Sequence, residues 1–159
     1  MDIKLIEASH IHKDVIKNLM QFYMYDFSEF VDVDVEADGL FAAYKNLDDY
    51  WNDENRFSYI IQKDEIYIGF VLIRYIEEQP LNHFSIAEFF VMRKYRRKGI
   101  GKSIATQIFN SHKGKWEVFQ KDNNKPAQLF WNKVINEYTE GNFSERFEDG
   151  KVIQGFIKK

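Results

Sequence analysis

Hydrophobic and polar residues alternate along this chain with two periods, and each period predicts a different element. Period-two alternation and short continuous apolar runs predict strands at 3–6, 56–62, 65–75, 83–92 and 116–120. Apolar residues spaced by three and four predict helices that follow Ser9, span 40–51, begin at Ile100 and begin at Pro126. Two strand-like stretches at 142–147 and 151–158, around Asp149-Gly150, predict a final hairpin. The predicted order is therefore β-α-α-β-β-β-α-β-α-β-β.

The stretch from His83 to Lys113 carries the clearest chemistry. Residues 83–92 are apolar and aromatic with Glu88 alone among them, as in a strand that is buried on both faces. A basic turn at 93–101 ends in Gly-x-Gly and leads into a helix. A helix N-terminus built from small residues offers unpaired backbone N–H groups and a favourable dipole to an anion. This turn is therefore a predicted binding site for a phosphorylated ligand.

Spacing excludes two common phosphate motifs. A P-loop needs glycine five residues before Gly101, and Arg96 stands there. The dinucleotide fingerprint that would begin at Gly99 needs glycine at position 104, which is Ile104.

The sequence Arg96-Arg97-Lys98-Gly99-Ile100-Gly101 resembles the R/Q-x-x-G-x-G/A motif of the GNAT superfamily of acetyl-CoA-dependent N-acetyltransferases. The residues 124–131, which run from Asn124 to Trp131, are similar to its second motif, N-x-x-A-x-x-F/L-Y. The resemblance implies an α+β fold in which helices flank a central, mostly antiparallel sheet. In that fold a parallel strand pair splays to admit the pantetheine.

The resemblance also implies the cofactor contacts. The turn's amides would bind the coenzyme A pyrophosphate, residues 89–91 would form one wall for the pantetheine, and 116–120 would form the other. The residues predicted to bind acetyl-CoA are Phe89, Phe90, Val91, Arg96, Arg97, Lys98, Gly99, Ile100, Gly101, Lys102, Ser103, Asn124 and Phe130. Two plainer roles stay open: Asn124 as a helix cap and Phe130 as a core residue.

Acetyl transfer to an amine needs a group that removes the amine proton, because an alkylammonium is not a nucleophile at neutral pH. Glu88 is the candidate general base, since burial in an apolar strand raises a carboxyl pKa. The alternative is that Glu88 points away and pairs with Lys102 or Arg74. The family's frequent tyrosine acid is replaced by Trp131, so a proton for the departing thiolate comes from elsewhere, such as Tyr138, or is not needed.

The acceptor pocket is predicted in the acidic segment between the first two helices. Residues 18–44 contain six acids and no base, whereas residues 93–102 contain six bases and no acid. The residues predicted to line the acceptor pocket are Tyr25, Phe27, Phe30 and Trp131. Acids and aromatic rings suit a cationic amine, although a solvated acidic loop explains the segment equally well. The acceptor itself, a small molecule or a peptide amine, stays open.

Composition narrows the function further. A chain of 159 residues with 45% hydrophobic residues is expected to form a single domain, residues 1–159. The absence of cysteine excludes disulfides and thiolate chemistry, and the four histidines lack metal-ligand spacing, so no metal is expected. A net charge of −3 argues against a nucleic-acid partner, and no apolar run is long enough to span a membrane. We expect a cytoplasmic monomer or homodimer; a catalytically silent acyl-CoA-binding sensor is the alternative function.

Overall fold

The computed structural model describes residues 2–159, and these residues form two compact units. Unit 1 contains the segment up to Leu72 together with Glu88–Arg96, and unit 2 contains Ile73–Ala87 and Arg97–Lys159. Strands β3 (Ile66–Ile76) and β4 (His83–Val91) each contribute residues to both units. The expectation of a single domain over 1–159 stays a prediction.

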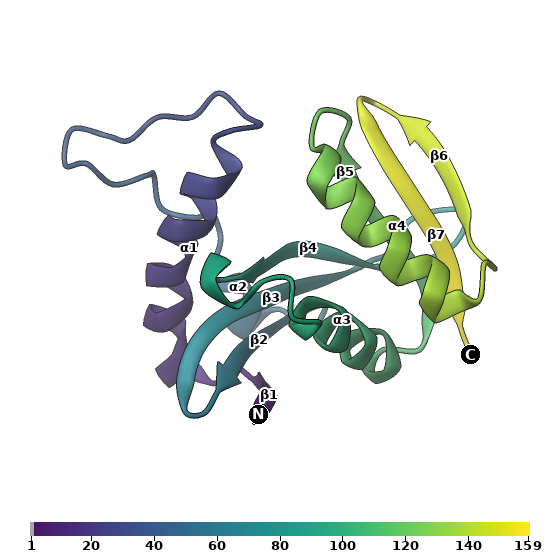
Figure 1. Ribbon diagram of the computed structural model, residues 1–159, viewed down its shortest axis with the longest axis horizontal. Helices are drawn as coiled ribbons and strands as arrows, with labels where there is room; N and C mark the ends of the chain where they lie inside the picture. Colours follow the sequence, from purple (N-terminus) through teal and green to yellow (C-terminus); the bar gives the residue numbers. More distant parts are fainter. Residues whose placement is uncertain (1) are drawn as a thin grey trace. The chain divides into compact units, whose positions relative to one another are not determined.

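Each unit has its own set of helices and strands (Figure 1). Besides its parts of β3 and β4, unit 1 contains β1 (Ile3–Glu7), η1 (His10–His12), α1 (Lys13–Phe27), α2 (Asp49–Asn52), β2 (Arg56–Lys63) and η2 (Arg93–Tyr95). Unit 2 adds α3 (Ile100–Ser111), β5 (Gly114–Lys121), α4 (Lys125–Thr139), β6 (Ser144–Glu148) and β7 (Lys151–Lys158). Apart from the short helices η1 and η2, the element order is the one predicted from hydrophobic periodicity.

The strands form a seven-stranded sheet in the order β1-β2-β3-β4-β5-β7-β6. Antiparallel pairing joins β1 to β2, β5 to β7, and β6 to β7. Strands β4 and β5 are parallel, with Phe84 opposite Trp116. The mixed, mostly antiparallel sheet with one parallel pair among residues 2–159 confirms the predicted α+β fold class.

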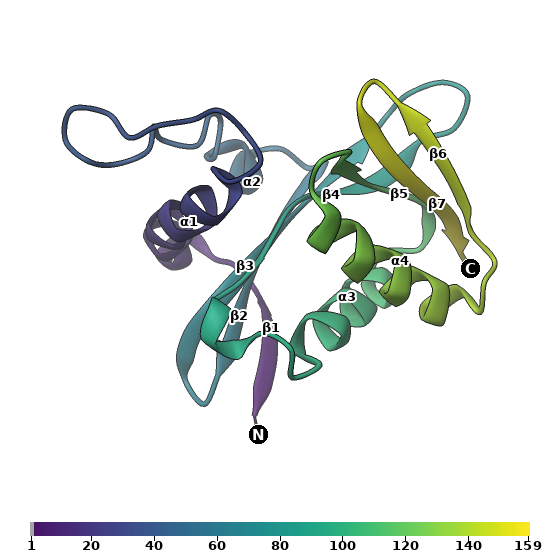
Figure 2. The same ribbon diagram turned by 45° about the horizontal axis from the view of Figure 1, so that its top comes forward.

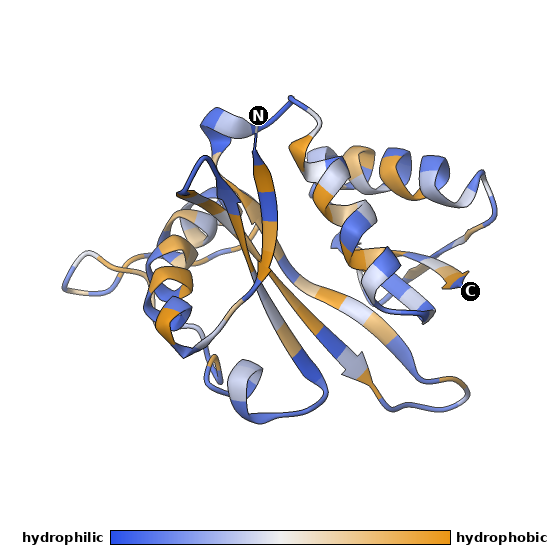
Figure 3. Ribbon diagram, turned by 90° about the horizontal axis from the view of Figure 1, so that it is seen from below, coloured by the Kyte–Doolittle hydropathy of each residue, from blue (hydrophilic) through white to orange (hydrophobic). Residues whose placement is uncertain are grey.

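Unit 1 has its core where α1 meets β3 and β4. The ring of Tyr23 on α1 contacts Phe70 and Phe90 with centroids 5.8 Å and 5.9 Å apart. Gly69 permits the backbone of β4 to approach closely, because a Cβ at this position would lie 2.1 Å from the carbonyl oxygen of Phe90. Figure 3 shows that apolar and polar residues alternate along β1, the strand next to the N-terminus, which pairs with β2.

Unit 2 has an aromatic core between its strands and the helices α3 and α4 (Figure 2). Trp116 is fully buried, and Phe109 lies edge-on to it with ring centroids 5.0 Å apart. Beside these rings Gln120 and Gln154, also buried, exchange two side-chain hydrogen bonds of 2.8 Å and 2.9 Å. The reciprocal pair satisfies both amides, which is what polar groups inside a core require.

The predicted helix at 40–51 is wrong for most of its length. The side chain of Gln21 donates to the carbonyl of Phe41 at 3.0 Å and accepts from its N–H at 2.9 Å, so this backbone cannot bond along a helix axis. Asn46 then takes a left-handed conformation (φ 62°), and only Asp49–Asn52 is helical. The segment after α1 is instead the extended loop at the upper left of Figure 1.

Candidate functional site

The glycine turn opens α3, as the sequence predicts. Gly99 is the N-cap in a left-handed conformation (φ 79°), and a Cβ placed there would have no atom within 4 Å. The first helical hydrogen bond runs from the Ser103 N–H to the Gly99 carbonyl at 3.1 Å. The amides of Ile100, Gly101 and Lys102 precede that bond, so they have no acceptor within the helix. The open glycine and these amides form a cradle that suits a phosphate group.

Positive charges around the turn divide into anchored and exposed groups. Lys102 forms an ion pair with Glu137 of α4, and no ion pair of Arg97 or Lys98 occurs within residues 2–159, where both are exposed. In unit 1, Arg96 donates from Nε to the Val91 carbonyl at 2.7 Å and pairs with Asp26. Arg97 and Lys98 are therefore the exposed cations of the turn, and Arg96 is held by Val91 and Asp26 while its contact with coenzyme A stays a prediction.

Asp26 belongs to the acidic segment that was predicted to face a cationic acceptor. It instead accepts from two arginines, Arg93 at 2.6 Å and Arg96. Because Asp26 is neutralised in this way, the acids available to a ligand begin after residue 28.

The second motif lies at the start of α4. Asn124 is the N-cap, and its Oδ1 accepts from the Ala127 N–H at 3.2 Å, so the capping role is present. The cap leaves the Asn124 NH₂ group available as a donor. Trp131 is only 7% exposed and packs on Phe130, with ring centroids 4.9 Å apart. Trp131 is thus a core residue of unit 2, and its contact with an acceptor stays a prediction.

Tyr138, the alternative acid, donates to the Asn110 side chain at 2.8 Å. Burial raises the pKa of Tyr138. Both features make it a poor proton source near neutral pH.

Glu88 lies on β4 among tyrosine hydroxyls. Tyr44 donates to its Oε1 at 3.2 Å, and Tyr23 supplies a second hydrogen bond. Burial raises the pKa of Glu88, and the two hydroxyls oppose that effect only in part. Lys102, the alternative partner, pairs with Glu137 instead. The carboxylate therefore has the environment of a proton acceptor and not that of an ion-paired anchor.

A cavity of about 190 Å³ in unit 1 adjoins this carboxylate through the side chain of Tyr44, which lines it. Its apolar wall includes Met20 from α1, and its polar wall includes Glu36, Asp38 and Lys17. Asp38 also accepts from the Leu40 N–H at 3.1 Å, which fixes the turn at the mouth. Two acids against one lysine give the cavity a negative balance.

The predicted acceptor aromatics lie elsewhere in unit 1. Tyr25 is 66% exposed, and Phe27 stacks on Tyr23 with ring centroids 5.8 Å apart. Phe30 is half-buried, and none of the three lines the 190 Å³ cavity. Two acids of this segment, Glu36 and Asp38, thus line the cavity, and the contact of Tyr25, Phe27 and Phe30 with an acceptor stays a prediction.

Of the residues 89–91, two have clear structural roles. Phe90 is buried and meets Tyr23 and Phe70, while the Val91 carbonyl accepts from Arg96. Their contact with a pantetheine stays a prediction, as does that of Phe89.

Tyr44 and Tyr23 were not identified from the sequence. Tyr44 was assigned to the predicted helix at 40–51, and its hydrogen-bond partner Glu88 lies 44 residues away in the sequence, so no local pattern connects the two. Tyr23 looked like one more apolar position of α1. One feature of the sequence could have indicated such partners. Glu88 is the single carboxylate in an apolar strand, and a buried carboxylate requires hydrogen-bond partners, which distant segments must supply.

Residues 17–136 match the model of the acetyltransferase (GNAT) family, and the chain therefore belongs to this family. No match was found among curated proteins. Neither a group of three or more His, Asp or Glu side chains able to hold a metal nor a helix long and apolar enough to cross a membrane occurs in residues 2–159.

Solved structures of the same fold cover nearly the whole chain. The PaiA N-acetyltransferase of Thermoplasma acidophilum in complex with coenzyme A has 12% identity, a TM-score of 0.66 and 99% coverage of both chains. A GNAT acetyltransferase of Streptococcus pneumoniae has 11% identity and a TM-score of 0.66 over 99% of this chain and 100% of its own. Arabidopsis thaliana NAA60 with a bisubstrate analogue has 12% identity and a TM-score of 0.62 over 98% of both chains.

Proposed function

We propose that this protein is an N-acetyltransferase that transfers the acetyl group of acetyl-CoA directly to a primary amine. The observation that carries the proposal is Glu88, a carboxylate that is held by two tyrosines, has a raised pKa and adjoins a negatively lined cavity. Family membership supports acyl transfer in general, and coenzyme A is bound in the Thermoplasma acidophilum protein. The cytoplasm remains the predicted location.

The glycine turn is the proposed binding site for the diphosphate of coenzyme A. The amides of Ile100, Gly101 and Lys102, with the side chain of Ser103, are its proposed hydrogen-bond donors. Exposed Arg97 and Lys98 add charge without losing an existing ion pair, which favours anion binding. The NH₂ group of Asn124 is a further donor on the next helix.

Glu88 is the proposed general base. Its carboxylate accepts a proton from the acceptor ammonium, either directly or through water. The neutral amine nitrogen then attacks the thioester carbonyl carbon, the new C–N bond forms, and the C–S bond breaks to release the thiolate of coenzyme A. The proton that the new amide nitrogen still carries passes to water or to the departing thiolate, which leaves the neutral amide. A thiolate is a stable leaving group near neutral pH, so a buried tryptophan at position 131 is compatible with this chemistry.

The proposed acceptor is an amine that carries further positive charge. Glu36 and Asp38 line the cavity beside Tyr44, and neither forms an ion pair within residues 2–159. A second ammonium group held there would leave the reacting nitrogen free for Glu88. Peptide and small-molecule amines both satisfy this requirement.

The test combines acetyl-CoA-dependent thiol release over a panel of mono-, di- and polyamines with calorimetric titration of coenzyme A. We expect turnover with a diamine or polyamine, and weaker coenzyme A binding in Arg97→Gln/Lys98→Gln than in the matched exposed control Lys133→Gln/Lys159→Gln. Binding without turnover on any amine would favour the catalytically silent sensor. Absence of binding would refute the role of the glycine turn.

A further inference from the structure

Unit 2 contains a larger hollow that has no role in the function proposed above. Its volume is about 560 Å³, within the range of roughly 300–1,000 Å³ that is usual for ligand pockets. It is lined by residues of the loop between β3 and β4, by Gly114 and Lys115 at the start of β5, and by Ile157 near the end of β7. Figure 2 shows the course of these segments. Every residue that lines it belongs to unit 2.

The floor of this hollow is aromatic. The rings of Tyr75 and Phe84 lie with centroids 4.7 Å apart, and Phe84 stacks in turn on buried Trp116 at 5.3 Å. Gly114, with φ 131°, adds no side chain at this edge of the Phe84 ring, since a Cβ there would contact the ring at 3.7 Å, and His112 packs on the same ring with centroids 5.1 Å apart. Leu81 and Ile157 at the rim are 52% and 63% exposed. Apolar groups thus surround a volume that a planar molecule would fill.

The charge at the hollow is positive. Lys113 and Lys115 both line it, and neither forms an ion pair within the part of the chain that the structure describes, residues 2–159. Lys113 is exposed and Lys115 is half-buried. An ammonium at the rim of an aromatic pocket favours an anion.

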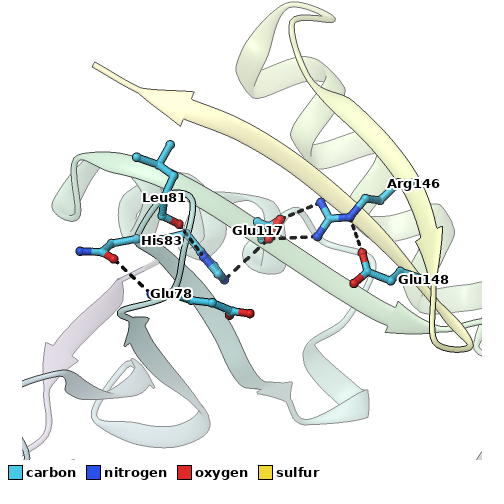
Figure 4. Close-up of polar contacts among 7 residues, drawn as sticks. Glu78, Leu81, His83, Glu117, Arg146 and Glu148 are labelled. Carbon is cyan, nitrogen blue, oxygen red and sulfur yellow. Dashed lines mark hydrogen bonds and ion pairs between the residues drawn. The ribbon is translucent and has the colours of Figure 1, made fainter.

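The carboxylate nearest to Lys115 along β5, Glu117, is already neutralised (Figure 4). Arg146 of β6 donates to both of its oxygens, at 2.7 Å and 3.1 Å, and its Oε1 lies 3.7 Å from the Nε2 of His83. Arg146 reaches Glu117 across β7, where the paired residue is Gly155 and no side chain intervenes. Arg146 is the main cause that lowers the Glu117 pKa, and Lys115 contributes least. Lys115 therefore remains available to a ligand.

We propose that this hollow is a binding site for a small aromatic acid, whose ring lies on Phe84 and Tyr75 and whose anionic group meets Lys113 and Lys115. The two lysines provide the charge selectivity, and the half-buried rings of Phe84 and Tyr75 provide the apolar surface. The site is built from residues that the proposed acetyl transfer does not use, so it stands or falls independently of that function.

The experiment uses the full chain saturated with coenzyme A, so that the glycine turn is occupied. The probe is 1-anilinonaphthalene-8-sulfonate, an aromatic monoanion, with N-phenyl-1-naphthylamine as its uncharged analogue; both are titrated by fluorescence. We expect the sulfonate to bind at least about tenfold more weakly to Lys113→Gln/Lys115→Gln, while the neutral analogue changes by less than about twofold. Amide shifts of Gly114 and Leu81 on titration would locate the probe.

The matched control is Lys133→Gln/Lys159→Gln, which removes the same charge from exposed positions outside the hollow. It should leave the sulfonate affinity within about twofold of the parent protein. A second variant, Leu81→Ala, trims only the exposed rim and should weaken both probes. The proposal is overturned if the sulfonate does not bind, binds equally to both lysine variants, or shifts amides outside the hollow.

Discussion

Two glutamates on β4 and β5 show how surroundings decide the role of a carboxylate. Glu88 in unit 1 has tyrosine hydroxyls as partners, and burial raises its pKa. Glu117 in unit 2 has Arg146 as a bidentate partner, which lowers its pKa. The same side chain is thus prepared for proton transfer in one unit and for ion pairing in the other.

The pKa values of Glu88 and Glu117 shift in opposite directions because their partners stabilise the ionised carboxylate to different extents. A guanidinium stabilises a carboxylate by its charge as well as by two hydrogen bonds, whereas a hydroxyl offers a dipole only. Burial costs both carboxylates solvation, but only Glu117 recovers that cost from a cation. Candidate bases in this fold should therefore be sought among buried acids whose partners are neutral.

The largest expected effect comes from Glu88→Gln, which keeps the shape and removes the base. We expect kcat/KM for the amine to fall by about 100-fold at pH 7, the lower end of what general-base catalysis contributes. Thiol release with the best amine of the panel measures this change. Coenzyme A affinity should be retained, because Glu88 is not among the residues proposed to bind it.

Glu117→Gln is the matched control, a change of the same type on the neighbouring strand. Its kcat/KM should stay within about threefold of the parent value, since an ion-paired acid contributes no proton transfer. Equal losses in the two variants, or unchanged kcat/KM of Glu88→Gln across pH, would remove Glu88 from the mechanism.

The next effect concerns stability in unit 2. Arg146→Met leaves Glu117 with a desolvated and unpaired charge, and we expect the free energy of unfolding at pH 7 to fall by about 1–2 kcal/mol, since both side chains are partly solvated. Denaturant titration measures it. Because the folded pKa of Glu117 is lowered from 4.5, the pair stabilises the fold above that pH and loses its effect as the pH falls.

The gap between the parent protein and Arg146→Met should therefore close in acid. Arg74→Met, an exposed arginine of β3, is the control and should change the unfolding free energy by less than about 0.5 kcal/mol. A gap that persisted unchanged at pH 3 would show that Arg146 acts through packing and not through its charge.

Most of the fold could be predicted from the sequence because periodicity reports burial directly. Gly99 and Asp149-Gly150 marked a helix start and a hairpin, and the structure has both. The helix at 40–51 failed because Gln21, distant in sequence, bonds the backbone of Phe41. A contact between remote segments overrides local propensity, and no local pattern reveals it.

In the candidate site, too, features formed by neighbouring residues could be predicted and contacts between distant segments could not. The glycine turn is local, so its residues were found together. The ion pair between Arg96 and Asp26 joins residues 70 positions apart, so no local pattern predicts it. The partners of Glu88 were missed for the same reason, and only the presence of a lone acid in an apolar strand predicted that such partners exist.

Tyr44→Phe changes the environment of Glu88 without removing the acid. The Tyr44 hydroxyl lowers the pKa of Glu88, so its loss should raise that pKa further and move the acid limb of the pH profile of kcat/KM to higher pH. At pH 7 we expect a loss of about threefold to tenfold, the worth of one hydrogen bond. The loss should shrink at higher pH.

Tyr67→Phe, whose ring contacts His12 in the same unit, is the control and should leave the profile in place. A uniform loss at every pH in Tyr44→Phe would mean that Tyr44 serves the cavity it lines and does not tune the base.

The smallest effect is a pH dependence of stability whose sign is opposite to that of Glu117. The pKa of Glu88 in the folded state is raised above its ordinary value of 4.5. Below pH 4.5 the carboxyl is protonated in both the folded and the unfolded state, so it does not change the free energy of unfolding. As the pH rises through the raised pKa, ionisation of Glu88 lowers the stability of the folded state. Glu88→Gln removes this cost while its amide oxygen still accepts from Tyr44. The variant should therefore equal the parent near pH 4 and exceed it by up to about 1 kcal/mol at pH 8.

Thermal unfolding of the two proteins at both pH values measures this difference. In Glu117→Gln the difference should run the other way, with a loss at pH 8 that vanishes in acid, because that carboxylate stabilises the fold only when it is ionised. If both glutamine variants lost stability at pH 8, the Glu88 carboxylate would also be favoured in its ionised form. It would then bind its proton too weakly to accept one from an ammonium, and the contrast that makes Glu88 the base would be gone.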